Sequence, residues 1–323
     1  MNRFGQNFAV EIFGESHGAA LGCIIDGVRP GIALSEDDFK EALERRRSGA
    51  FGTTPRREPD IPHIVSGVYE GETTGAPLMI IFHNENADSS SYENAIPRPG
   101  HADFTAMCKF LCPDLRGGGH FSGRLTLPVV AAGVVARKMI GEGLEISAAL
   151  KNIGGCEDSA KWDSLLKEAS EEGDSLGGIV ECTAKGLPVG LGEPFWDSLE
   201  SLISHAIFSI PGVRGIEFGD GFGASAMKGS EHNDPFGPEG LPLKNGSGGV
   251  NGGLSNGAPL LFRVAFKPTS SISKVQNTYD FENEKMAELS VKGRHDVCFA
   301  IRTPVIVESC TAIVLADLLL RTI

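Results

Sequence analysis

The sequence predicts an α+β fold in a single domain. Segments that alternate between apolar and polar residues come in pairs separated by short turns, which is typical of antiparallel hairpins. Two helical segments, one in the middle and one at the end of the chain, are strongly apolar and are expected to be buried. No fixed-period repeat and no linker-like break divides the chain, so we expect one domain over residues 1–323 rather than a doubly wound parallel sheet.

The predicted elements follow from hydrophobic period, capping residues and turn signals. Ser35 with Asp38 resembles a capping box and Gly49 follows the last turn, which predicts a helix over residues 35–47. Cys112-Pro113 ends a helical pattern that begins after residue 100. Further helices are predicted at residues 126–141, 198–210 and 304–320, and strands at residues 7–13, 20–25, 63–69, 77–83, 144–150, 177–185 and 260–266.

Charge and composition exclude several classes of protein. With a net charge of −13 and a pI near 5.1, the chain is not expected to bind nucleic acid or an anionic membrane surface. Glu308 and Asp317 interrupt the last apolar run, and no signal peptide is evident, so no membrane segment is expected. Seven cysteines, an odd number, give no disulfide framework, and no set of metal ligands is evident. We therefore expect a cytoplasmic protein with reduced thiols and no metal site.

Residues 98–124 form the strongest candidate for an anion site. Asp103 is expected to cap the helix that follows, which would put Arg98 and His101 beside the free N–H groups of a helix N-terminus. Downstream, three consecutive glycines would let the backbone approach a ligand closely. The alternative is a surface turn with solvated cations. The glycines are bracketed by basic side chains, namely Arg116, His120 and Arg124.

Residues 45–57 contain five arginines within thirteen positions of an acidic protein. Cations in the last turn of a helix complement its dipole, and Glu44, Glu58 and Asp60 are available as partners, which is the structural explanation. Five arginines exceed what capping requires. We therefore favour a carboxylate or phosphate ligand, because each charge-assisted hydrogen bond from arginine contributes about 1.5–3 kcal/mol.

Residues 14–18, Gly-Glu-Ser-His-Gly, match the nucleophile elbow of serine hydrolases. Such an elbow needs a strand, a sharp turn and then a helix, whereas a second strand is predicted directly after this turn. We therefore discount a hydrolase. Ser16 and His17 are predicted to face a ligand, and the alternative is a structural role in a polar hairpin turn.

The glycine-rich loops do not match the common nucleotide-binding motifs, since neither G-x-x-x-x-G-K-[ST] nor G-x-G-x-x-G after a strand is present. A different set of motifs runs along nearly the whole chain, and their types and order are similar to those of chorismate synthases. They lie at residues 13–18, 23–30, 45–49, 56–60, 98–103, 116–119, 218–222, 251–256, 267–272 and 293–309.

The resemblance implies an activity, a cofactor and an assembly. Chorismate synthases convert 5-enolpyruvylshikimate 3-phosphate to chorismate by 1,4-anti elimination of phosphate, and they require reduced FMN although no net redox change occurs. They are homotetramers with a helical core between antiparallel sheets. No flavin reductase domain is evident here, so an external flavin reductant is expected. The arginine clusters agree with a substrate that carries one phosphate and two carboxylates.

The resemblance also implies roles for individual residues. His17 would protonate the reduced flavin and His101 would assist the departing phosphate, since histidine can donate a proton near neutral pH. Asp296 would lie beside flavin N(5), helped by Ser16 and Ser122 in the proton relay. Arg47, Arg56, Arg98, Arg124 and Arg294 would bind substrate, and the flavin would contact Ser122, Gly123, Arg124, Asn251, Gly252, Gly253, Lys267, Ser271, Arg294 and Asp296.

Two points complicate these assignments. After the three glycines, the common family continuation Arg-Ser-Ser-Ala-Arg-Glu-Thr is replaced by His-Phe-Ser-Gly-Arg-Leu-Thr over residues 120–126. Asp296 also has an alternative role in an exposed ion pair with Arg294 or His295. The alternative to an enzyme is a protein with this scaffold that binds a flavin or phosphate ligand and catalyses no reaction.

Overall fold

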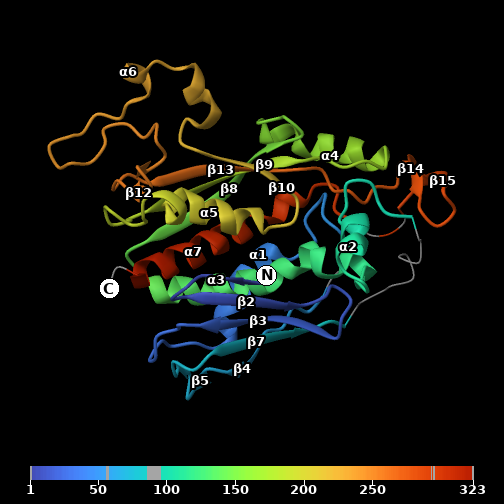
Figure 1. The fold of residues 1–323 in the computed structure, drawn as a ribbon, viewed down its shortest axis with the longest axis horizontal. Coiled ribbons are helices and arrows are strands. Elements are labelled where there is room, and N and C mark those ends of the chain that lie inside the picture. Colours follow the sequence, from blue (N-terminus) through green and yellow to red (C-terminus); the bar gives the residue numbers. More distant parts are fainter. Residues whose placement is uncertain (1, 56–57, 86–95, 292, 294, 322–323) are drawn as a thin grey trace.

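The computed structural model describes residues 2–55, 58–85, 96–291, 293 and 295–321. Two antiparallel β-sheets enclose a layer of helices, with α3 and α7 at its centre (Figure 1). The predicted α+β class is confirmed, and so is the helical core between the sheets that the family resemblance implied.

The first sheet has the strand order β1-β2-β3-β7-β4. Every second side chain of β3 and β7 is fully buried, as in Leu21, Cys23 and Ile25 of β3, because this face packs on the helices. The hairpin predicted near the N-terminus is β2 paired with β3. The strands are β1 (Arg3–Phe4), β2 (Ala9–Gly14), β3 (Ala20–Asp26), β4 (His63–Ser66) and β7 (Leu78–His83).

The second sheet has the strand order β10-β13-β9-β8. In β13, Leu260, Phe262, Val264 and Phe266 are buried and the residues between them are less so, because alternate side chains of a strand point to opposite faces of the sheet. Its edge strand β10 was not predicted. The strands are β8 (Glu145–Ile153), β9 (Gly178–Lys185), β10 (Val213–Phe218) and β13 (Leu260–Phe266).

The two central helices pack closely because glycine allows it. A Cβ atom on Gly133 of α3 would lie 2.3 Å from the Cβ atom of Ser309 in α7.

The amphipathic helix α4, which lies on the outer side of the second sheet in Figure 1, was not predicted. The helices are α1 (Lys40–Arg46), α2 (Asp103–Lys109), α3 (Thr126–Ile140), α4 (Trp162–Glu171), α5 (Leu199–Phe208), α6 (Gly229–His232) and α7 (Pro304–Arg321).

The far end of α7 is joined to the N-terminal segment by one buried carboxylate. Asp317 Oδ1 accepts hydrogen bonds from the backbone N–H groups of Gln6, Asn7 and Phe8, at 2.8, 2.6 and 2.9 Å. Its other oxygen accepts one from Arg321 at 2.7 Å. Burial alone would raise the pKa of Asp317, but these hydrogen bonds lower it below its ordinary value.

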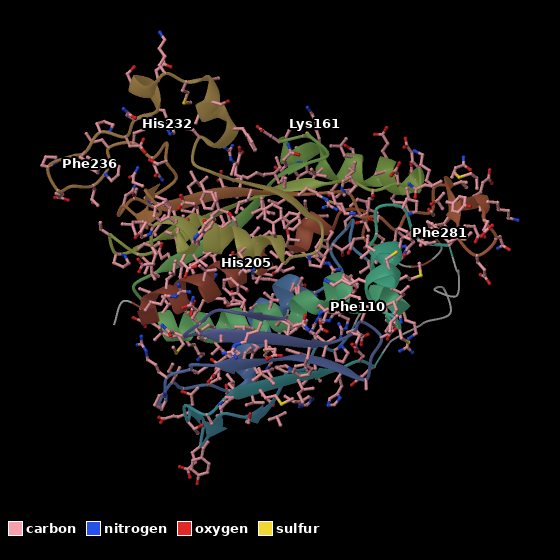
Figure 2. All side chains as sticks on the ribbon, viewed as in Figure 1. Phe110, Lys161, His205, His232, Phe236 and Phe281 are labelled. Carbon is pink, nitrogen blue, oxygen red and sulfur yellow. The ribbon has the colours of Figure 1, made fainter. Side chains whose placement is uncertain are left out.

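Smaller elements surround the two main sheets. The rings of Phe104 in α2 and Phe281 stack with centroids 4.5 Å apart, which joins α2 to the β14–β15 hairpin, and Figure 2 labels Phe281 beside it. Among the described residues, no helix combines the length and apolar content needed to cross a bilayer. The short strands are β5 (Val68–Tyr69), β6 (Glu72–Thr73), β11 (Val250–Asn251), β12 (Leu254–Ser255), β14 (Gln276–Asp280) and β15 (Lys285–Leu289).

Candidate active site

A cavity of about 740 Å³ lies in the helical layer and reaches the loops at one end of it. Apolar side chains of β2, α3 and α7 form one wall, among them Ile12, Val129 and Ile313, and His205 of α5 contributes to another. Ten predicted site residues line it although they come from segments far apart in the sequence. They are Ser16, Arg47, Arg98, His101, Ser122, Gly123, Arg124, Lys267, Ser271 and Asp296.

The turn over Gly117, Gly118 and Gly119 has a backbone that only glycine adopts readily. Its φ angles are 59°, 85° and 52°, all in the left-handed region. A Cβ atom on Gly119 would also lie 1.7 Å from the carbonyl oxygen of Asp114. The N–H of Ser16 donates to the carbonyl of Gly119 at 3.1 Å, so the β2–β3 turn is fixed against this glycine turn.

The glycine turn brings the two predicted catalytic histidines to adjacent positions. A Cβ atom on Gly117 would lie 2.3 Å from His17 Nε2, and one on Gly118 would lie 3.4 Å from His101 Nε2. His101 lines the cavity, while the buried His17 packs against Gly117, which lines it. Glycine therefore supplies the space in which both imidazoles lie.

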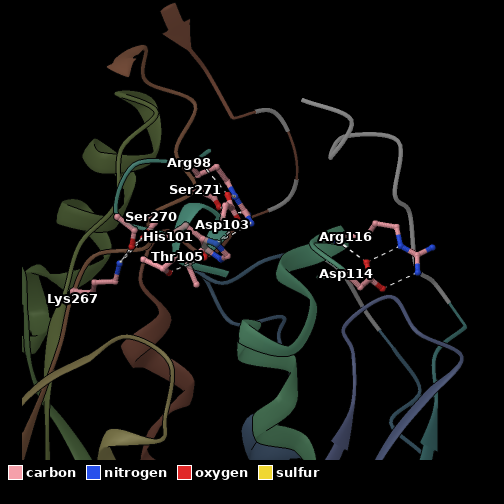
Figure 3. Close-up of polar contacts among 11 residues, drawn as sticks. Arg98, His101, Asp103, Thr105, Asp114, Arg116, Lys267, Ser270 and Ser271 are labelled. Carbon is pink, nitrogen blue, oxygen red and sulfur yellow. Dashed lines mark hydrogen bonds and ion pairs between the residues drawn. The ribbon is translucent and has the colours of Figure 1, made fainter. Parts of the chain in front are cut away.

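The side chain of Asp103 connects two other predicted residues (Figure 3). Arg98 donates to both of its oxygens, from Nε at 2.7 Å and from Nη2 at 2.8 Å, and His101 Nδ1 lies 2.7 Å from Oδ1. Burial would raise the pKa of Asp103, but the hydrogen bonds from Arg98 and His101 hold it well below its ordinary value. Arg98 Nη1 also donates to Ser271 at 3.1 Å.

The predicted role of Asp103 as a helix cap is wrong. The N-cap residue of α2 is Ala102, and no side chain caps this helix. The Asp103 carboxylate points back to the preceding loop, where it accepts hydrogen bonds from Arg98 and contacts His101. Arg98 and His101 are therefore held by a carboxylate instead of lying beside a bare helix N-terminus.

Asp60 connects two buried arginines in the cavity wall. Arg46 Nη2 lies 3.1 Å from one oxygen of Asp60 and Arg124 Nη1 lies 2.9 Å from the other. Burial would raise the pKa of Asp60, but Arg46 and Arg124 lower it below its ordinary value. Burial also lowers the pKa of Arg46 to about 10, and the repulsion from Arg302 and Arg124 adds to the effect.

Arg45 and Arg47, the other described arginines of residues 45–57, have separate partners, and Arg57 lies outside the described residues. Arg45 forms two hydrogen bonds with buried Glu308 of α7, at 2.8 and 2.7 Å, and it is not among the described residues that line the cavity. Arg47 Nη2 donates to the carbonyl of Pro59 at 2.8 Å, and this side chain lines the cavity. Arg56 lies outside the described residues.

Asp296 is held by Arg302, a residue that the sequence analysis missed. Arg302 Nη2 donates to Asp296 Oδ2 at 2.8 Å, and the N–H of Thr54 donates to Oδ1 at 2.8 Å. This pair is largely buried, so the alternative of an exposed pair with His295 does not hold. A cation six positions after Asp296, just before a predicted helix, is too weak a signal to have identified Arg302.

His295 also lines the cavity without having been predicted to do so. Its Nε2 atom is buried and has no hydrogen-bond partner among the described residues. Burial lowers the pKa of His295 below 6.5, and the charges of Arg98 and His101 lower it further. The imidazole is therefore neutral near pH 7.

Lys267 lies at a polar part of the cavity wall beside the loop of His101. Its Nζ donates to the carbonyl oxygen of Gly100 at 2.6 Å and contacts Ser270 Oγ, which donates to the same carbonyl at 2.9 Å (Figure 3). Burial lowers the pKa of Lys267, and the nearby charge of Arg214 contributes. Lys267 and Arg214 together leave this wall positively charged.

Three predicted flavin contacts do not line this cavity. Asn251, Gly252 and Gly253 form the β11–β12 turn, and none of them lines the cavity in the described part of the chain. Arg294 lies outside the described residues.

Ser16 follows a strand and precedes another strand, so the geometry of a nucleophile elbow is absent there and the hydrolase hypothesis fails.

Comparisons with known proteins agree along the whole chain. A family model described as chorismate synthase matches residues 8–320. A chorismate synthase of Chitinophaga pinensis is 54% identical over 324 residues, covering 99% of this chain and 97% of the relative, and one of Dehalococcoides mccartyi is 45% identical over 352 residues with the same coverage. A solved structure titled "Crystal Structure of Chorismate Synthase" superposes with a TM-score of 0.76 at 27% identity, covering 99% of this chain and 93% of that one.

The fold and these full-length matches together define a carbon–oxygen lyase. The matches to relatives are full-length and share one activity. The chain belongs to the chorismate synthase family. It converts 5-enolpyruvylshikimate 3-phosphate to chorismate in the shikimate pathway, as a carbon–oxygen lyase of a family that uses reduced FMN.

Proposed function

We propose that the elimination takes place in the cavity described above, with His101 assisting the departing phosphate and His17 holding the proton that the reduced cofactor needs. The observation that supports this most is the packing of both imidazoles on consecutive residues, Gly117 and Gly118, of one turn. Imidazole nitrogens take up and release protons near neutral pH, as both tasks require.

Unpartnered buried donors support the binding of a polyanion here. Within the described ranges, Arg47 Nε, Arg124 Nη2 and Arg302 Nε are buried and have no hydrogen-bond partner. A buried donor without a partner costs about 1–3 kcal/mol, and more when charged, so a bound anion would recover that free energy. We assign the carboxylates and phosphate of the substrate to Arg47, Arg98 and Arg124.

We propose that reduced FMN, which when bound supplies electron density to the substrate ring as phosphate leaves, lies in the same cavity. We assign the flavin phosphate to Lys267 and Ser271, because Lys267 carries its charge on a partly buried wall. Asp296 would contact the flavin ring, and Arg302 fixes its carboxylate. Ser16 would assist the proton relay, and further contacts to flavin are proposed for Ser122, Gly123 and Arg124.

The other assignments stay predictions. Arg56 and Arg294 are proposed to bind substrate, and Asn251, Gly252 and Gly253 to contact the flavin. We further propose one catalytic domain, which the continuous apolar core through both sheets supports, a homotetramer, an external flavin reductant, and a cytoplasmic location, which seven unpaired cysteines support. Sizing with light scattering tests the tetramer.

An anaerobic assay tests the roles of the two histidines. The wild-type enzyme should release phosphate from the substrate only when reduced FMN is present. His17→Ala and His101→Ala should each lower kcat by about 10²–10⁴-fold, the usual contribution of a general acid, while FMN binding measured by fluorescence quenching largely persists. Unchanged kcat in either variant would contradict the role given to that residue.

A further inference from the structure

The Asp103 carboxylate contacts His101 on the side of the ring opposite Nε2. The distance from His101 Nδ1 to Asp103 Oδ1 is 2.7 Å, whereas Nε2 is the atom nearest to the position of a Cβ on Gly118. Asp103 is buried and does not cap α2. Its position is therefore not explained by helix formation.

The contacts around Nδ1 determine which ring nitrogen carries the proton. Arg98 Nη2 also lies near Nδ1, at 3.1 Å, but a guanidinium can only donate. If Nδ1 were unprotonated, its lone pair would face the carboxylate oxygen of Asp103 at 2.7 Å, which is repulsive. A proton on Nδ1 turns this contact into a charge-assisted hydrogen bond. In neutral His101, Nε2 is then the unprotonated nitrogen on the side of the glycine turn.

We propose that Asp103 is a positioning residue for catalysis, which fixes the tautomer and orientation of His101 so that Nε2 exchanges the proton with the departing phosphate. The proposal rests on the role given to His101 above. Asp103 acts through a second residue as well, because it holds Arg98 through two hydrogen bonds. It therefore couples the group that binds the anion to the group that protonates it.

The tautomer of His101 can be measured in the wild-type protein without any variant. Nitrogen-15 NMR of protein labelled at histidine, assigned with His101→Ala, distinguishes a protonated Nδ1 from a protonated Nε2. We expect the Nδ1–H form in the neutral imidazole at high pH. A neutral ring protonated at Nε2 would overturn the proposal, whatever the activity of the enzyme.

A double-mutant cycle tests whether Asp103 acts on catalysis through His101. Asp103→Asn keeps the shape of the side chain and should lower kcat by at least about 10-fold and by up to about 10⁴-fold, the loss caused when asparagine replaces the aspartate that fixes the tautomer of a catalytic histidine. In the His101→Ala background the same change should lower kcat by less than about threefold, because residues that act as a unit are not additive. Asp103→Asn should also change KM, because Asp103 holds Arg98, and this change in KM should be the same in both backgrounds.

The outcomes separate this proposal from the proposed function. Equal losses of kcat from Asp103→Asn in both backgrounds would overturn the inference while leaving the role of His101 intact. No loss of kcat from His101→Ala alone would instead contradict the role of His101. Asp197→Asn is the matched control. It also removes an aspartate that pairs with an arginine, since Asp197 lies 2.8 Å from Arg321, but neither residue lines the cavity. This change should leave kcat unchanged.

Discussion

His17 Nε2 lies 2.3 Å from the point at which a Cβ atom on Gly117 would be placed. Two non-bonded heavy atoms cannot lie this close, so the new Cβ atom in Gly117→Ala must displace the imidazole. We expect kcat/KM to fall by about 10²-fold, which is the usual cost of misplacing a reacting group by about 1 Å. Anaerobic steady-state assays measure the loss.

The control for Gly117→Ala has the same backbone strain without the contact. Gly240 has a φ of 75° and nothing within 4 Å of its Cβ position. Gly240→Ala should destabilise the fold by about 1–2 kcal/mol, the cost of the left-handed region, without changing kcat/KM. Equal effects of the two changes on kcat/KM would show that strain, and not the position of His17, is responsible.

Arg45 should matter for stability and not for catalysis. It is the partly exposed partner of buried Glu308, which also accepts hydrogen bonds from Arg137 and from the N–H of Ala148. Arg45→Ala removes two charge-assisted hydrogen bonds and should cost about 1.5–3 kcal/mol in the free energy of unfolding. Urea unfolding measures this cost, and the KM for substrate should be unchanged. A rise in KM would mean that Arg45 also serves the ligand.

The ionised carboxylate of Asp60 should stabilise the folded protein at neutral pH, and this contribution should be lost in acid. Its folded-state pKa is lower than the ordinary value of 3.8, so the unfolded chain binds more protons than the folded one as the pH falls below that value. Its contribution is present above about pH 4 and is lost as the pH falls through the folded pKa. In Asp60→Asn, two buried guanidinium groups lose their partner, which should cost about 3–5 kcal/mol at pH 7. Denaturant unfolding between pH 2.5 and 7, as approximate limits, should show a shallower acid slope for the variant than for wild type.

His295 should affect stability in a different pH range. Because its pKa in the fold is below 6.5, the unfolded chain binds more protons between the two pKa values, and stability should fall as the pH drops through 6.5. His295→Gln cannot titrate, so the difference in unfolding free energy between pH 7.5 and pH 5.5, as approximate test points, should be smaller than in wild type. An identical pH dependence in the two proteins would contradict a depressed pKa.

The sequence predicted the elements that form long apolar runs between turn or capping residues. The strand expected at residues 260–266 is β13 itself, and the helix expected at residues 304–320 is α7 with one residue more. The predicted strand over residues 63–69 is divided at Gly67, whose φ of 85° breaks the ladder. Edge strand β10 was missed because it buries few side chains, and surface helix α4 was missed because it lies in a segment rich in acidic residues.

The candidate site was predicted unevenly, for reasons of geometry. The residues that line the cavity lie in short motifs of charged, hydroxyl and glycine residues, which local patterns can identify. The pairing of Asp296 with Arg302, or of Asp60 with Arg46, depends on tertiary packing that no local pattern specifies. The prediction that Asp103 caps the helix is wrong because its carboxylate contacts Arg98 and His101 instead.

The hydrogen bonds from residues 6–8 to Asp317 have a consequence for biosynthesis. The acceptor follows Phe8 by 309 positions, so residues 6–8 leave the ribosome long before α7 exists. The inner face of β8 and β9, which packs against α7, also lacks this partner until the last residues are made and is exposed to other nascent chains, which makes aggregation during translation a hazard of this topology. A chaperone that shields the emerging second sheet should therefore raise the yield of native enzyme more than one that acts on the finished chain.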